Sequence, residues 1–203
     1  SSGRVSSGVV TVDGTEIMGL PEAAMRNIRS FKISLIFQEP ATSLNPVMTV
    51  GDQIVETILL HTPLRGEEAR AKALDWLKKV GIPEPERRMK SFPFELSGGQ
   101  KQRVAVASAI ASERPLILFD EPTSGLDLFH MRQVANVVNQ VANAGRTALV
   151  VTHDPEFILR CCNYVLHLEN GQILESYSIE NGDGRNRLLK FFLNDMEKEV
   201  STE

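Results

Sequence analysis

Two neighbouring carboxylates, Asp120 and Glu121, follow directly after the apolar run Leu116–Phe119. The run has the length of a buried strand, and α/β sheets place their ligands at the carboxyl ends of such strands. Asp120 can hold Mg²⁺ there, commonly through water, while Glu121 can orient or deprotonate an attacking water. Alone, such a pair is more often two solvated carboxylates at the start of a loop. The sequence that follows, Pro122–Asp127 (P-T-S-G-L-D), favours the functional interpretation.

A serine and two glycines, Ser97, Gly98 and Gly99, precede Gln100 at the head of a predicted helix. Ser97 stands where an N-cap belongs, and the glycines allow a phosphate to approach the free backbone N–H groups of the first turn. The helix dipole favours negative charge at the same place. A lone S-G-G would more often be a turn that merely starts a helix, so this motif depends on the others.

Two further polar residues stand at the ends of predicted strands. His153 follows the apolar stretch 148–152, from where its imidazole can reach a phosphate, although a lone histidine in such a place is more often structural. Gln38 ends the stretch Ile33–Phe37, and its amide can contact Mg²⁺ or a water of that ion. By itself Gln38 is a weak indication.

Together these motifs resemble the ATP-binding cassette (ABC) ATPase family. L-S-G-G-Q at 96–100 matches the family's signature motif, L-I-L-F-D-E at 116–121 its Walker B strand, and S-G-L-D at 124–127 its D-loop. The resemblance implies that Glu121 is the catalytic carboxylate, His153 the switch histidine, and Asp120 and Gln38 residues of the Mg²⁺ site.

The same resemblance implies a pair of cassettes that close head to tail on two ATP molecules. ATP and Mg²⁺ are then the expected cofactors. Contact with the γ-phosphate of ATP on the opposite subunit is expected from four residues, Ser97, Gly98, Gly99 and Gln100. Asp127 is expected at the seam between the two subunits, with Gln38 also close to the nucleotide.

One motif of the family, the phosphate-binding Walker A loop G-x-x-x-x-G-K-[S/T], does not occur in the 203 residues, which contain no Gly-Lys pair. Residues 8–17 resemble the strands that follow that loop and its helix in the family. We therefore expect that the sequence starts behind the Walker A segment, and that the chain as given is inactive alone. Its signature face would still serve the ATP of an intact partner.

The elements that must position these residues alternate between helix and strand from residue 97 onward. Such alternation predicts a mainly parallel sheet. The expected fold class is α/β, a P-loop NTPase-like ABC ATPase core with antiparallel N-terminal strands around Asp13-Gly14 and a helical subdomain. We expect one domain over 1–203, with the helical region at 41–95 and a helical tail at 180–203. The stretches Ile33–Phe37 and Ala148–Val151 are predicted as buried strands.

Composition limits the alternatives. The net charge is −4 and charged residues make up 24% of the chain, without the basic excess that nucleic-acid binders usually carry, so no nucleic-acid partner is expected. No apolar run reaches the roughly 18 to 20 residues of a membrane span. The two cysteines, Cys161 and Cys162, are neighbours, which favours reduced thiols in the cytosol. By resemblance the protein is expected on the cytoplasmic side of the cell membrane, attached through a partner.

Two branches of the family are similar to different parts of the chain. Residues 37–46 resemble the peptide and nickel importer ATPases, whereas residues 100–127 and 190–193 resemble the energy-coupling factor ATPases of vitamin and metal uptake. Both branches imply an importer, with a second ATPase subunit, transmembrane permease subunits and a substrate-binding component as partners. The permease's coupling helix is expected to contact the region from Gln38 to about Glu95, in particular apolar residues around Val47–Ile54.

Two other interpretations remain open at this point. A soluble ABC ATPase of translation or DNA repair would usually carry two cassettes or a long basic or coiled-coil insertion, and the sequence shows neither. A non-catalytic cassette would fit the missing Walker A loop. Glu121 and His153 count against that interpretation, because a decayed site would be expected to lose them.

Overall fold

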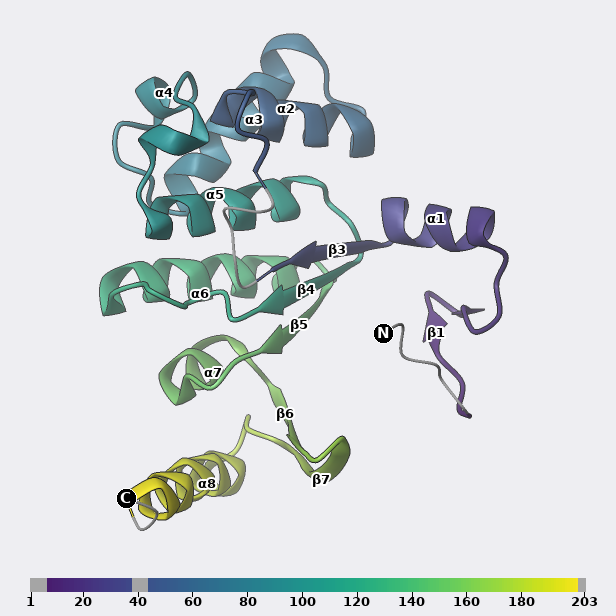
Figure 1. Ribbon diagram of the computed structural model, residues 1–203, viewed down its shortest axis with the longest axis vertical. Coiled ribbons are helices and arrows are strands. Elements are labelled where there is room, and N and C mark those ends of the chain that lie inside the picture. Colours follow the sequence, from purple (N-terminus) through teal and green to yellow (C-terminus); the bar gives the residue numbers. More distant parts are fainter. Residues whose placement is uncertain (1–6, 38–43, 201–203) are drawn as a thin grey trace.

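A computed structural model describes residues 7–37 and 44–200, with side chains up to residue 193. At its centre is a parallel three-stranded sheet with the order β3-β4-β5 (Figure 1). Its strands are β3 (Ile33–Ile36), β4 (Leu116–Asp120) and β5 (Thr147–Val151). Because Asp120 pairs with Val151 at the carboxyl edge, the residues that follow β4 and β5 emerge side by side.

Two helices cover one face of this sheet, α5 (Gly98–Ala111) and α6 (Leu128–Asn143). Ile117 and Phe119 of β4 point toward them, have no exposed surface, and share one apolar cluster with the buried side chains of both helices. Alternation along β4 therefore sends Asp120 to the opposite face from Phe119.

Among the described residues, the side chains on the opposite face of the sheet are largely exposed. Leu35, Leu149 and Val151 are 45%, 46% and 56% exposed there. The prediction that Ile33–Phe37 and Ala148–Val151 are buried strands is thus wrong for this face. A parallel strand is buried only where helices cover both faces, and α5 and α6 cover one.

Helices fill most of the segment between β3 and α5. They are α2 (Val50–His61), α3 (Gly66–Lys79), α4 (Pro85–Arg88) and a 3₁₀ turn at Pro93–Glu95. Thr49 caps α2 by accepting a hydrogen bond from the backbone N–H of Asp52 at 3.2 Å. Ile54, Ile58 and Leu77 are fully buried between these helices and α5. That the region 41–95 is a subdomain of its own stays a prediction.

The N-terminal part forms the predicted antiparallel hairpin, β1 (Thr11–Val12) and β2 (Thr15–Glu16), followed by α1 (Glu22–Phe31). Asp13 and Gly14 take positive φ angles of 51° and 73°, as a tight hairpin turn requires. The Asp-Gly signal is confirmed.

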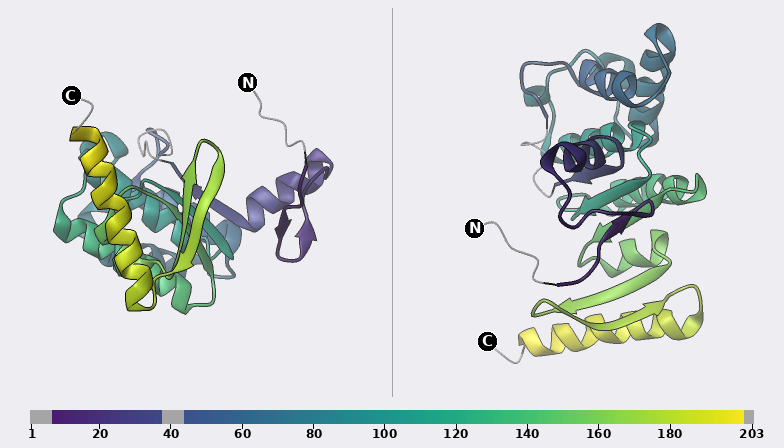
Figure 2. Two further views of the ribbon diagram at one scale, coloured as in Figure 1. Left: turned by 90° about the horizontal axis from the view of Figure 1, so that it is seen from below. Right: turned by 90° about the vertical axis from the view of Figure 1, so that its right-hand side faces the viewer.

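The C-terminal part consists of α7 (Pro155–Cys161), β6 (Tyr164–Glu169), β7 (Gln172–Ser178) and α8 (Gly182–Val200). Within the described residues β6 and β7 pair only with each other, antiparallel, and α8 lies along them with Leu188 fully buried (Figure 2). The predicted α/β class, with a parallel sheet, antiparallel N-terminal strands and helical segments, is confirmed. No helix in the described ranges combines the length and the apolar character that crossing a bilayer requires.

Candidate functional site

The chain turns sharply where β4 ends. Glu121 has a φ of 45°, in the left-handed region that side chains other than glycine rarely adopt. Two backbone hydrogen bonds hold this conformation: the N–H of Glu121 donates to the carbonyl of Val151 at 2.9 Å, and its own carbonyl accepts from the N–H of Ser124 at 3.2 Å. Strained residues of this kind collect at functional sites, where the surrounding structure must enforce them.

The side chain of Glu121 is bound by the two residues that follow β5. The Nδ1 atom of His153 lies 2.8 Å from its Oε1, and the hydroxyl of Thr152 donates to its Oε2 at 3.4 Å. Only 15% of the Glu121 side chain is exposed, against 84% for His153. The hydrogen bond with Glu121 raises the pKa of His153 above its usual range, and the negative charge of the carboxylate adds to the effect.

The contact between Glu121 and His153 predicts a pH dependence of stability. A histidine whose pKa is raised in the folded protein stabilises the fold below its unfolded pKa, and this contribution is lost as the pH rises through the raised value. The difference in melting temperature between wild type and His153→Ala should therefore be largest near about pH 6 and should shrink as the pH rises through the raised pKa of His153. The effect is small because His153 is 84% exposed. Glu121→Gln should remove the same pH dependence; a difference that grew with pH would contradict the pairing.

The signature residues form the first turn of α5. Ser97 is its N-cap: the Ser97 hydroxyl accepts from the N–H of Gln100 at 3.3 Å, and the Gln100 side chain accepts from the N–H of Ser97 at 3.0 Å. This reciprocal capping box fixes the start of the helix. The prediction that Ser97 is an N-cap is confirmed.

The two glycines keep the start of α5 open to an anion. A β-carbon on Gly98 would meet no atom within 4 Å, so this position faces free space, and a β-carbon on Gly99 would lie 3.1 Å from the side chain of Leu126. Gly98 and Ser97 are both exposed. A helix start with free N–H groups, no β-carbon and open space fits a phosphate group.

Asp127 is the N-cap of α6, and His130 binds it twice. The backbone N–H of His130 donates to Oδ1 at 2.8 Å, and its ring Nδ1 lies 2.8 Å from each carboxylate oxygen. The backbone and ring hydrogen bonds from His130 lower the pKa of Asp127. Asp127 is 65% exposed and is therefore available to a partner surface.

The carboxylates at the end of β4 suit Mg²⁺ held partly through water. Among the described residues no group of three or more His, Cys, Asp and Glu side chains is placed to hold a metal ion. Mg²⁺ usually keeps several waters and takes one or two protein carboxylates, so Asp120 at the carboxyl edge of β4 fits this ion. Gln38, the second predicted residue of the Mg²⁺ site, lies outside the described residues.

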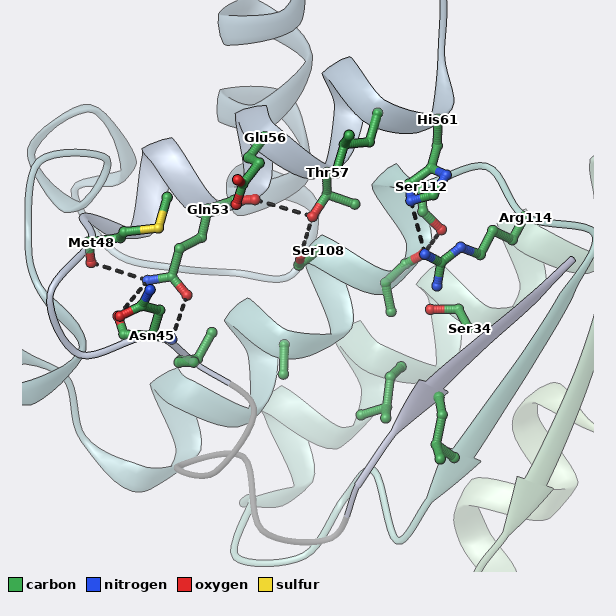
Figure 3. Close-up of a pocket in the computed structure, with 16 residues that line it drawn as sticks. Ser34, Asn45, Met48, Gln53, Glu56, Thr57, His61, Ser108, Ser112 and Arg114 are labelled. Atoms are coloured by element: carbon green, nitrogen blue, oxygen red, sulfur yellow. Dashed lines mark hydrogen bonds between the residues drawn. The ribbon is translucent and has the colours of Figure 1, made fainter. Parts of the chain in front are cut away.

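A groove of about 350 Å³ lies between α2, α5 and β3 (Figure 3). At one end Gln53 holds the chain that precedes α2, with its amide bound to Asn45 and to the carbonyl of Met48 at 3.0 Å. At the other end the Arg114 guanidinium donates to the carbonyl of Ile33 at 3.0 Å and lies 2.8 Å from Nε2 of His61. Burial and the Arg114 charge lower the pKa of His61, which favours its neutral form.

The sequence profile described as "ABC transporter" matches residues 2–124. The chain belongs to the ABC transporter family. Two of its curated relatives are the peptidoglycan transport ATP-binding protein YejF of Agrobacterium fabrum, 41% identical over 86% of this chain, and the oligopeptide transport ATP-binding protein OppD of Escherichia coli, 38% identical over 86%. The chain spans 32% of the first relative's length and 52% of the second's.

The fold of this ABC chain is also that of a solved cassette. The dimeric structure of the ATP-binding cassette MJ0796 in a post-hydrolysis state, bound to ADP and Pi, matches with a TM-score of 0.76 and 30% identity, covering 87% of this chain and 75% of that one. A second dimeric structure of MJ0796 matches with a TM-score of 0.77. The ABC ATPase fold is confirmed.

The structure brings some of the predicted residues of the ABC motifs together and leaves others apart. Glu121 and His153 are in contact, whereas in the described part of the chain no hydrogen bond joins residues 97–100 to either of them. That residues 97–100 serve the nucleotide of a second subunit stays a prediction.

Two buried polar residues of α5 were not predicted as site residues. Arg103, 4% exposed, donates to the carbonyls of Gly99 at 3.2 Å, of Val80 at 3.2 Å and of Gly81, so it ties the signature turn to the end of α3. Gln102 contacts the backbone of Glu121 at 3.4 Å. The only sequence signal for either was a polar pair within the apolar side of a helix.

Proposed function

We propose that this chain is part of the ATP-binding and ATP-hydrolysing subunit of an ABC importer that takes up peptides. The observation that carries the proposal is the 2.8 Å contact between Glu121 and His153 at the carboxyl edge of the parallel sheet. A carboxylate held in a strained turn and bound by a histidine is a suitable base for a water attacking a phosphate. Peptides are favoured as the cargo because relatives such as OppD are named for oligopeptide transport.

The predicted site residues have different roles in ATP binding and hydrolysis under this proposal. Bound Mg-ATP supplies the phosphoanhydride bond that is broken. Glu121 orients the attacking water and takes its proton, and His153 holds the Glu121 carboxylate in place through the 2.8 Å hydrogen bond. Asp120, together with Gln38, would hold Mg²⁺. Ser97, Gly98, Gly99 and Gln100 would receive the γ-phosphate of the nucleotide on the second subunit, and Asp127 would line the seam between the two.

The partners follow from the same proposal. A second ATPase subunit, of the same or a related chain, would pair head to tail with this one; the matched solved cassettes are dimeric. Permease subunits would dock on the groove between α2 and β3, on the cytoplasmic side of the membrane, and a substrate-binding component would deliver the cargo.

The function can be tested in the source cell with the protein at its natural length. We expect that Glu121→Gln at the chromosomal locus lowers the uptake of a labelled tripeptide by about 100-fold or more, the scale of a lost general base. Uptake of Ni²⁺ and of a vitamin, measured in parallel, separates the peptide assignment from the other importer classes. Tripeptide uptake that Glu121→Gln leaves unchanged would contradict the proposal.

A further inference from the structure

Gln102 is a buried amide within α5 that has more hydrogen-bonding capacity than it uses. It is 1% exposed, its Nε2 donates to the backbone carbonyl of Glu121 at 3.4 Å, and its Oε1 has no partner in the part of the chain that the structure describes. An unpaired buried amide oxygen is unfavourable, and a methionine of similar size would avoid it. Packing alone therefore does not explain an amide at this position.

The atom that Gln102 contacts belongs to the strained turn. The carbonyl of Glu121 already accepts from the N–H of Ser124 at 3.2 Å, and the Gln102 amide is its second donor. The φ of Glu121 is 45°, a conformation that needs support from outside the turn. Gln102 is the contact that connects this carbonyl to α5.

The other end of the connection is the start of the same helix. Ser97 and Gln100, five and two residues before Gln102, cap α5, and the Arg103 side chain binds the carbonyl of Gly99 at 3.2 Å. Gln102 thus lies in the second turn of a capped helix of 14 residues, and we expect a shift at the first turn to reach it.

We propose that Gln102 is a positioning residue that couples the seating of the signature turn to the backbone of Glu121. The inference rests on the proposed function, in which the signature turn serves the ATP of one site and Glu121 the ATP of the other. Gln102 then links the two nucleotide sites of the pair within a single subunit. Its contact is with a carbonyl next to the reacting carboxylate, not with substrate.

The test is a double-mutant cycle read by NMR on the chain, without nucleotide. The signal is the ¹³C shift of the Glu121 carbonyl, which responds to hydrogen bonds at its oxygen. Ser97→Ala perturbs the first turn of α5, and it is introduced into wild type and into Gln102→Met. The matched control is Gln133→Met, because within the described ranges the Oε1 of Gln133 is likewise buried without a partner but lies against Gly81.

We expect Gln102→Met to shift the Glu121 carbonyl signal and Gln133→Met to leave it in place. The shift caused by Ser97→Ala in wild type should be lost in the Gln102→Met background and kept in the Gln133→Met background. The coupling is overturned if Gln102→Met leaves the Glu121 carbonyl shift unchanged. It is also overturned if Ser97→Ala changes that shift equally in all backgrounds. Failure of the proposed function would be seen separately, as peptide uptake that survives Glu121→Gln.

Discussion

We expect Gly98→Asp to reduce ATP hydrolysis by the assembled transporter strongly while leaving this chain folded. ATP hydrolysis by the natural-length protein in its membranes should fall by about 100-fold or more, the scale of the stabilisation that donors give to a developing phosphate charge. The aspartate would place a negative charge and a side chain in the open space that a phosphate needs. It would thus oppose the anion by charge and by volume.

The same substitution should not destabilise the fold, so it separates an effect on the nucleotide site from an effect on stability. A β-carbon on Gly98 meets nothing within 4 Å, and an acidic residue in the first turn of a helix is favourable by about 0.3–1 kcal/mol. Urea unfolding of the chain should therefore show unchanged or slightly higher stability. Loss of hydrolysis without loss of stability would locate the effect in the site.

A matched control is available at the start of another helix. Gly182 begins α8, and a β-carbon there also meets nothing within 4 Å. Gly182→Asp should leave hydrolysis unchanged, since α8 carries none of the proposed nucleotide contacts. If Gly98→Asp hydrolysed ATP at the wild-type rate, the signature turn of this chain would not face a nucleotide.

Local signals in the sequence predicted the parts of the site that depend on neighbouring residues. The hydroxyl and amide of Ser97 and Gln100 cap α5 because their spacing of three residues suits a capping box. Asp13-Gly14 makes the hairpin turn for an equally local reason. Asp120 ends β4 and His153 lies two residues past the end of β5. The apolar runs of both strands were visible in the sequence, so the place of these two residues at the carboxyl edge of the sheet could be predicted.

Contacts between distant segments could not be predicted in this way. That His153 binds Glu121, 32 residues earlier, depends on β4 and β5 being neighbours in register. The left-handed conformation of Glu121 is imposed by its surroundings. Glycine, the usual sequence signal of such a conformation, does not occupy this position. Gln102 looked like one polar residue in a mixed helix, and only its depth in the fold makes it a contact of the Glu121 carbonyl.

The same limit explains the open face of the sheet. Apolar residues such as Leu149 and Val151 predicted strands correctly, but the pattern could not say which face the described helices would cover. A continuous apolar run is typical of a strand buried on both faces, but it does not show which segments cover those faces.

Val47→Asp is expected to uncouple peptide uptake from ATP hydrolysis. The region Val47–Ile54, predicted from the sequence as a docking surface for the permease, is divided by the structure: Val50 and Ile54 are fully buried, whereas Val47, which precedes the groove-lining Met48 in the chain, is 79% exposed. Substitutions at Val50 or Ile54 would thus test folding. Val47→Asp should change the stability of the chain by less than about 0.5 kcal/mol, as surface substitutions usually do.

Leu60 offers a second position on the same groove, because it lines the cavity between α2 and β3 and is 66% exposed. We expect Val47→Asp and Leu60→Asp, each at the chromosomal locus, to lower tripeptide uptake by about 10-fold, an apolar contact of roughly 1.4 kcal/mol, with hydrolysis in the membranes retained. Leu193→Asp is the control, since this residue is 60% exposed on α8, at the other end of the molecule. Equal effects of all three substitutions would point to a general loss of protein, and wild-type uptake in both groove variants would place the permease contact on another surface. A loss of tripeptide uptake confined to the Val47 and Leu60 variants would mean that the permease contacts this chain at the groove between α2 and β3.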